Sequence, residues 1–312
     1  EKIFNYIKAK AGRKDYDVIE FHSVVTEKNN ATLNLLNFDF RLNGIKTIFL
    51  SDSHNVFIYP KNRNITLKKN RDFNFSGVVF AGKFEFFGKE FAFQYDNFKI
   101  DMPIVDSLRI KVETEEVDEY GQKVLKRVKS VIEYSKGELL VDQMGNKSGI
   151  KPFPEYPIFN SVKDSYVFYE KESIQKGVYK RDSFYFHLEP FQFDSIDNFR
   201  NEALQFKGSF ASAGIFPTFD ENLSLQPDFS LGFNRPTPNE GFPAYSGKGL
   251  YNNKIRLSHE GLRGDGVLKY LTSTTESKDF IFFPDSMNAV SMNFNIEEHV
   301  VGEVEFPAVN GN

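Results

Sequence analysis

The residues best suited to catalysis or metal binding are scattered along this sequence. No two of the five histidines lie within five residues of each other; they are His22, His54, His187, His259 and His299. A metal site built from histidine usually needs a close pair on one face of a helix or strand. In the alternating run Phe184–Leu188, His187 occupies a polar position. This position favours a solvated strand face for its side chain. The spacing therefore predicts no histidine metal site.

Several other chemistries lack their characteristic residues. The sequence has no cysteine, which excludes disulfides, thiolate zinc sites and cysteine nucleophiles. It has no Gly-x-Ser-x-Gly elbow, Walker loop or dinucleotide fingerprint, because Gly261–Gly266 has its glycines at other offsets. Within it, Arg263-Gly264-Asp265 spells a tripeptide found in adhesion proteins, but Gly-Asp-Gly also suits a hairpin turn, and we expect the turn. We expect no cofactor.

Acidic side chains offer two further possibilities. Glycoside cleavage uses one carboxyl group kept neutral by burial and a second one ionised nearby. Four acids have apolar sequence neighbours: Glu133, Asp142, Glu189 and Asp194. Because the chain contains 43 acids, such pairs arise freely, and the absence of Trp removes the strongest platform for sugar rings. We expect no enzyme; a glycan-binding or glycan-cleaving domain remains an alternative, with Tyr rings beside two acids.

Two loops gather oxygen ligands of the kind that calcium binds. They are Asp142–Ser148 and Asp194–Asn198, and the candidate ligands in the second are Asp194, Asp197 and Asn198. Neither loop matches the twelve-residue calcium loop with its terminal Glu. The alternative is that these side chains cap their own backbone.

Aromatic residues in alternating runs are the strongest signal. The chain has 35 Phe, and Phe91, Phe93, Tyr95 and Phe98 alternate or nearly alternate with polar residues. Such residues form the core face of a strand. The alternative is that Phe91, Phe93, Tyr95 and Phe98 line an apolar groove that shelters acyl chains.

Strand patterns dominate the whole sequence. Short apolar runs of period two recur, and almost every window long enough for a helix is broken by Gly, Pro or Asn. We expect at most two or three short helices, and the candidate segments are Glu1–Lys10 and Ser195–Leu204. The pattern predicts an all-β fold, an elongated stacked β-sheet or β-solenoid-like architecture, with tandem antiparallel β-sandwiches as the alternative.

Proline-rich segments suggest the domain organisation. Proline donates no backbone hydrogen bond and disfavours a central strand. We expect a β-rich module over residues 1–150, a connection at 151–165 and a second module over 166–312 with a loop at 234–243. A weak repeat supports modularity, because an aromatic residue precedes Gly77, Gly208 and Gly247 by two positions.

Charge and hydropathy exclude some partners. The formal charge is -4 and the pI is about 5.9, so the chain has no excess of cations for phosphates and we expect no nucleic acid partner. It has no run of about 18 apolar residues and no leader with a cleavage site. We therefore expect no transmembrane span and no signal peptide. The start at Glu1 and the end at Asn312 favour an internal fragment of a longer protein.

Three stretches resemble parts of large β-rich cell-envelope proteins of Bacteroidota. They are Asn74–Ile100, Leu257–Leu271 and Phe280–Ser286. A fainter likeness, resting on the alternation, is to the folded-over sheets of AsmA and TamB proteins. The resemblance implies an exported protein of the periplasm or outer surface, and it transfers no catalytic residue.

The sequence as a whole favours a non-catalytic structural or interaction segment of a large envelope protein. Its partners would be other segments of the same protein or other envelope proteins. A lipid-handling groove and a glycan-binding domain are the alternatives, with lipid or glycan as the partner.

Overall fold

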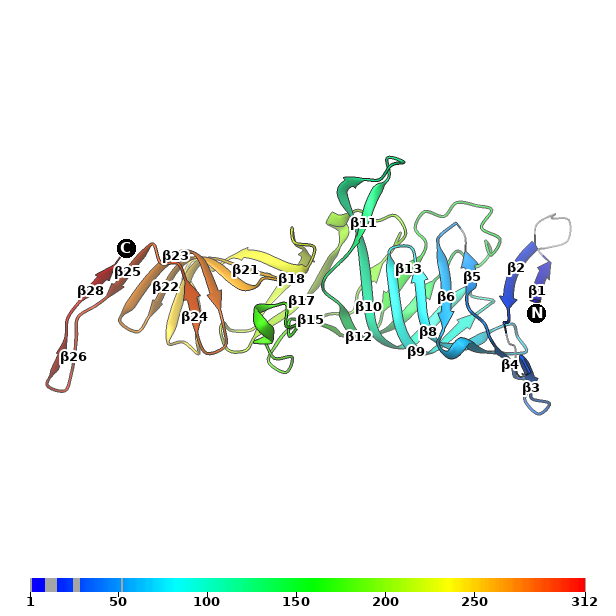
Figure 1. The fold of residues 1–312 in the computed structure, drawn as a ribbon, viewed down its shortest axis with the longest axis horizontal. Coiled ribbons are helices and arrows are strands. Elements are labelled where there is room, and N and C mark those ends of the chain that lie inside the picture. Colours follow the sequence, from blue (N-terminus) through cyan, green and yellow to red (C-terminus); the bar gives the residue numbers. More distant parts are fainter. Residues whose placement is uncertain (1, 9–15, 25–28, 52, 312) are drawn as a thin grey trace. The chain divides into compact units, whose positions relative to one another are not determined.

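The computed structural model describes residues 2–8, 16–24, 29–51 and 53–311 (Figure 1). Strands account for 57% of the residues and helices for 3%, so the prediction of an all-β fold is confirmed. The described residues form 28 strands and three 3-10 helices of three residues each. Every strand pairing in the described residues for which a register is defined is antiparallel.

The chain divides into two compact units. The first contains residues 1–127, 131–165 and 189–203. Its elements are β1 (Lys2–Lys8), β2 (Tyr16–His22), β3 (Ala31–Leu33), β4 (Phe40–Asn43), β5 (Ile48–Ser51), β6 (Val56–Pro60), η1 (Lys61–Arg63), β7 (Asn64–Leu67), β8 (Phe73–Ala81), β9 (Phe84–Gln94), β10 (Lys99–Val117), β11 (Lys123–Arg127), β12 (Ile132–Leu140), β13 (Ile158–Ser161), β16 (Gln192–Phe193) and η3 (Asn201–Ala203). Figure 1 shows β8, β9 and β10 side by side, and each is hydrogen bonded to the next.

The second unit contains residues 128–130, 166–188 and 204–312. Its elements are β14 (Ser165–Phe168, beginning at the boundary), η2 (Gln175–Gly177), β15 (Phe184–Leu188), β17 (Gln205–Ser212), β18 (Phe219–Leu225), β19 (Leu231–Pro236), β20 (Phe242–Ala244), β21 (Gly249–Ser258), β22 (Gly261–Tyr270), β23 (Ser273–Phe282), β24 (Met287–Ala289), β25 (Asn293–Ile296), β26 (His299–Val301), β27 (Val304–Phe306) and β28 (Val309–Gly311). Neighbours in sequence mostly pair with each other, as in a meander.

The runs in which apolar and polar residues alternate form strands, because the apolar positions are buried on one face. In β15, Phe184, Phe186 and Leu188 are buried while Tyr185 and His187 are half-buried on the other face. Burying a large apolar side chain stabilises the fold by about 1.5–3 kcal/mol. The alternation thus fixes which face of each strand turns to the core.

β9 keeps two pairs of rings in the core despite a break in the alternation. Phe84 and Phe86 are fully buried, and so are Phe91 and Phe93, although their positions differ in parity. Glu90 between them has φ 58°, and the pairing of β9 shifts register in this region. A β-bulge inserts one extra residue and reverses the phase. The bulge lets all four rings face inward.

Both predicted helical segments differ in the structure. Lys2–Lys8 is a strand paired with β2, and only Asn201–Ala203 within Ser195–Leu204 is helical, as one 3-10 turn. Ile3, Phe4 and Ile7 have a spacing that suits either a helix or a strand, and pairing with β2 selects the strand.

The glycine-rich run at Gly264–Gly266 is a strand rather than the predicted turn. It lies inside β22, and the turn falls earlier, between Ser258 and Gly261. A Cβ on Gly264 would approach Tyr251 Oη to 2.3 Å, and one on Gly266 would approach Asn252 O to 2.0 Å. Gly264 is therefore needed because the Tyr251 ring occupies the space of its side chain, which the sequence does not reveal.

The proline-rich segments are more ordered than a connection requires. Residues 151–165 belong to the first unit and contain β13, which pairs with β12. Within 234–243, Asn234–Pro236 end β19 and Pro243 lies in β20, so only the middle is a loop. β20 is short, and the pairing at Pro243 is with β21 alone. Edge positions of this kind tolerate proline.

Candidate functional site

The aromatic residues that the sequence suggests for an apolar groove lie in the core of the first unit. Phe91 and Phe93 are fully buried, and Tyr95 and Phe98 are 4% and 2% exposed. The Phe93 ring centroid lies 4.8 Å from that of Phe73. In this structure the four rings pack against protein and offer no open surface to an acyl chain.

The proposed calcium ligands point in different directions. Asp194 and Asn198 are exposed, whereas Asp197 Oδ2 lies 3.0 Å from His54 Nδ1. On the other side of the imidazole ring, His54 Nε2 lies 3.6 Å from Asp142 Oδ2. Since the ring separates the two carboxylates, they do not converge on one ion. In the part of the chain that the structure describes, no group of three His, Asp or Glu side chains could hold a metal ion.

Asp142 is the buried member of this cluster, which sequence analysis places among four candidate acids. Burial raises the pKa of its carboxyl group, and the nearby Glu155 charge adds to the rise; a hydrogen bond from Gln143 N and the His54 ring oppose it. Asn146 Nδ2 donates to Asp142 Oδ2 at 2.8 Å. The cluster ties together three loops of the first unit.

The other candidate acids do not join Asp142. Glu133 is half-buried on β12, and Glu189 and Asp194 are exposed. Their positions offer no pairing of a buried acid with an ionised one.

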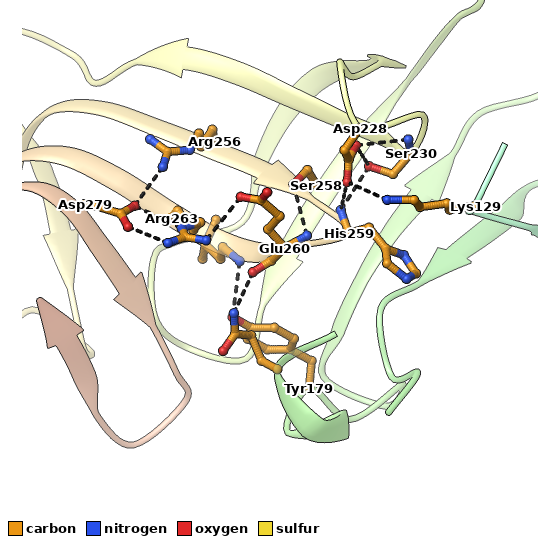
Figure 2. A network of polar contacts seen from close by, with 12 residues as sticks. Lys129, Tyr179, Asp228, Ser230, Arg256, Ser258, His259, Glu260, Arg263 and Asp279 are labelled. Carbon is orange, nitrogen blue, oxygen red and sulfur yellow. Dashed lines mark hydrogen bonds and ion pairs between the residues drawn. The ribbon is translucent and has the colours of Figure 1, made fainter. Parts of the chain in front are cut away.

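A second polar network surrounds the turn between β21 and β22 (Figure 2). Asp228 accepts from the backbone N–H of His259 at 3.2 Å and from the Ser230 hydroxyl at 2.6 Å. Lys129 Nζ lies 3.6 Å from the same carboxylate. Burial opposes ionisation of Asp228, but the hydrogen bonds of Ser230 and the Lys129 charge outweigh it and lower its pKa.

The ring of His259 makes a separate contact with Ser173. Ser173 Oγ lies 2.8 Å from His259 Nε2. Burial lowers the pKa of His259, and the charges of Lys171 and Lys129 lower it further, which favours the neutral ring. A hydroxyl on a neutral imidazole is one element of a nucleophilic site. Here, however, the carboxylate of Asp228 accepts a hydrogen bond from the backbone N–H of His259. The contacts of Asp228 and Ser173 with His259 therefore hold the turn between β21 and β22 in place.

The arginine of the Arg-Gly-Asp tripeptide is engaged on the sheet. Arg263 Nε donates to Asp279 Oδ1 at 2.9 Å, and Arg256 Nη2 donates to the same atom at 2.7 Å (Figure 2). The hydrogen bond from Arg263 lowers the pKa of Asp279 despite partial burial. The contacts of Arg256 and Arg263 with Asp279 link the three strands β21, β22 and β23.

The second unit carries a two-stranded ribbon with exposed apolar side chains. Among the described strands, β26 and β27 pair only with each other, through a turn at Gly302-Glu303, where Gly302 has φ 65°. At its base, β25 pairs with both β23 and β28. We call residues 297–311 the acidic ribbon.

The acidic ribbon has one apolar face. Directly paired residues share a face of the sheet, which places four side chains together: His299, Val301, Val304 and Phe306. The His299 and Phe306 rings stack at 4.9 Å between centroids. Val301 is 60% exposed and Phe306 is 45% exposed. An isolated two-stranded hairpin is only marginally stable in water.

The charge of the acidic ribbon has one sign. It contains Glu297, Glu298, Glu303 and Glu305 and no Lys or Arg. Every residue from Val300 to Gly311 is exposed. The ribbon therefore presents exposed valines, an exposed aromatic ring and negative charge together, with unpaired strand edges.

Sequence analysis missed His54, Ser173 and the acidic ribbon. The first two act through partners 143 and 86 residues away, which no local pattern reveals. The ribbon had a visible signal, since Gly302-Glu303 stands between short apolar alternations in a segment without cations.

The described helices are each a single 3-10 turn, and none has the length or the apolarity to cross a membrane. Comparisons of the chain with protein-family models, with curated proteins and with solved structures found no match.

Proposed function

We propose that this chain is a non-catalytic interaction segment of a larger cell-envelope protein, in which the acidic ribbon docks onto a basic partner with an exposed strand edge. The observation that carries the proposal is that Val301, Val304 and Phe306, on one face of the ribbon, are exposed in the part of the chain that the structure describes. The envelope location rests on the resemblance of Asn74–Ile100, Leu257–Leu271 and Phe280–Ser286 to envelope proteins of Bacteroidota.

The chemistry of the partner follows from the ribbon. Its four glutamates repel a second acidic ribbon, so pairing of two copies through this element is unfavourable. Lys or Arg flanking the partner's strand would complement them. The free edges of β26 and β27 supply backbone donors and acceptors for an added strand, and the apolar face supplies area to bury.

The rest of the second unit provides a firm base for this element. β25, at the foot of the ribbon, is paired with β23, and β23 is paired over most of its length with β22. Arg263 of β22 and Arg256 of β21 both bind Asp279 of β23. A rigid base lowers the entropy lost when the ribbon binds.

Site-specific photo-crosslinking in the native cell tests the proposal. We expect a crosslinker at Val301, on the apolar face, to capture one partner, and the captured peptide to be a strand flanked by Lys or Arg. The same crosslinker at Tyr120, which is 85% exposed on the hairpin of β10 and β11, is the control and should not capture that partner. Capture of an acidic segment, equal capture from Tyr120, or no capture at Val301 would refute the proposal.

A further inference from the structure

A small pocket in the second unit lies beside two tyrosines. It has a volume of about 210 Å³, and its lining residues are Tyr245, Leu268, Tyr270, Asp285, Ser286 and Met287. Tyr245 follows β20, Tyr270 ends β22, and Asp285 and Ser286 lie in the loop between β23 and β24. We call it the tyrosine pocket.

The two rings of the tyrosine pocket form a corner. Their centroids are 6.1 Å apart and their planes stand at 87°. Tyr245 is fixed in place, because its backbone N–H donates to Ile215 O at 2.8 Å and its hydroxyl donates to Ser286 O at 2.7 Å. Its φ of 52° is unusual for an aromatic residue. Backbone strain of this kind persists only where surrounding contacts hold it.

The polar groups of the pocket leave an acceptor available to a ligand. The Tyr245 hydroxyl donates a hydrogen bond to Ser286 O, and the Ser286 hydroxyl donates one to Asp285 Oδ1 at 3.1 Å. The second oxygen of the exposed Asp285 carboxylate remains at the rim. The negative charge of this carboxylate repels an anion and attracts a cation.

Aromatic faces carry negative electrostatic potential and attract cations within about 6 Å of the ring. Two perpendicular tyrosine rings with a carboxylate at the rim form the type of cage that binds alkylated ammonium groups. Leu268 and Met287 supply apolar surface for the alkyl substituents. The small volume suits a head group and not a long chain.

We infer that the tyrosine pocket binds an alkylated ammonium group, held between Tyr245 and Tyr270 with Asp285 as its counter-charge. The group can belong to a free small molecule or to a lipid headgroup, because both present the same chemistry. The tyrosine pocket shares no lining residue with the acidic ribbon, and the inference does not rest on the ribbon's proposed role.

Calorimetric titration of the whole chain with choline chloride tests the inference. We expect saturable binding with a dissociation constant of about 1 mM or tighter, within reach of a ligand of this size. The uncharged isostere 3,3-dimethyl-1-butanol has the same shape, and we expect it to bind about tenfold more weakly because it lacks the charge. Equal binding of the isostere, or no binding of choline, would overturn the inference.

Matched variants locate the site. Tyr270→Leu and Asp285→Asn should each weaken choline binding by about three- to tenfold. The controls Tyr120→Leu and Asp106→Asn make the same changes at exposed positions of the first unit and should leave binding unchanged. Asp285 is exposed, so its variant keeps the test valid if Tyr270→Leu is unstable. Wild-type affinity in a folded Asp285→Asn or Tyr270→Leu protein would also overturn the inference.

Vesicles distinguish the two sources of the ligand. If the ammonium group is a headgroup, vesicles of phosphatidylcholine bind the chain, vesicles of phosphatidylglycerol do not, and Asp285→Asn abolishes the difference. If choline binds and phosphatidylcholine vesicles do not, the ligand is a free small molecule. Either result supports the cage, whereas binding to both vesicle types with no effect of Asp285→Asn contradicts it.

Discussion

At the scale of single residues, the polar side chains described above mainly link segments that are far apart in sequence. His54 joins Asp142 and Asp197, and His259 joins Ser173 and Asp228. These contacts use the same residue types as catalytic sites. Their geometry differs, because the carboxylates lie on opposite sides of one ring or bind the backbone of the other histidine.

Glu85 allows a prediction of how stability depends on pH. Its side chain is buried; burial disfavours its charge, but hydrogen bonds from Lys111 and Arg127 outweigh that effect and hold its pKa below the ordinary 4.5. The ionised group therefore stabilises the fold above about pH 4.5, and this contribution is lost as the pH falls through the lower folded pKa. We expect Glu85→Gln to cost about 1–3 kcal/mol at pH 7 and progressively less on acidification.

Urea unfolding of both proteins between pH 7 and pH 3 measures this difference. The same substitution at the exposed Glu119 is the control and should change the free energy of unfolding by less than about 0.5 kcal/mol. A difference for Glu85→Gln that stays constant over the whole pH range would contradict the role given to its charge.

Part of this residue-scale picture was accessible from sequence. The polar phase predicted for His187 is confirmed by its half-buried position on β15. Asp142 was chosen for its apolar neighbours and is buried. The partners of these residues were not predictable, because a contact such as His54–Asp197 depends on how loops 143 residues apart meet.

At the scale of elements, alternation predicted strands well, whereas the prediction of a turn at Gly264–Gly266 was wrong. Two alternating stretches of the sequence, Lys99–Met102 and Leu108–Val112, belong to one strand, β10. Its pairing with β12 shifts register after Met102 and so accommodates Pro103. Gly264 and Gly266 lie in mid-strand because neighbouring strands approach them closely. A sequence shows that a glycine is present, but not whether backbone freedom or lack of a side chain is needed.

Gly264→Ala tests the second reason. The new methyl group would meet the Tyr251 hydroxyl at 2.3 Å, and Tyr251 is fully buried with its hydroxyl donating to Lys254 O. We expect a loss of about 1–3 kcal/mol in the free energy of unfolding, which is typical of overpacking. Thermal or urea unfolding measures it.

Gly311→Ala is the matched control, because nothing lies within 4 Å of the position of its Cβ. It should change the free energy of unfolding by less than about 0.5 kcal/mol. Equal effects of the two substitutions would show that close packing by Tyr251 is not the reason for glycine at position 264.

At the scale of the whole molecule, the sequence predicts two β-rich modules joined at residues 151–165, and the structure has two compact units that each combine segments distant in sequence. A first unit that includes residues 189–203 and a second that includes residues 128–130 depend on pairings such as β13 with β16. Composition reveals proline-rich segments but not which unit each one joins. Many of the aromatic residues that dominate the sequence are buried inside the two units. The acidic ribbon is exposed, and core packing therefore does not explain its apolar face.

Amide hydrogen exchange of the acidic ribbon tests the central claim most directly. The purified chain should exchange the amides of residues 300–306 rapidly, while those of β22 stay protected, because among the described strands β26 and β27 pair with each other alone whereas β22 is paired on both sides. In envelopes prepared from the native cell, the ribbon amides should become at least about tenfold slower, as expected for strands that gain a partner. The same rapid exchange in both preparations would contradict an interaction segment, and so would a ribbon already protected in the purified chain.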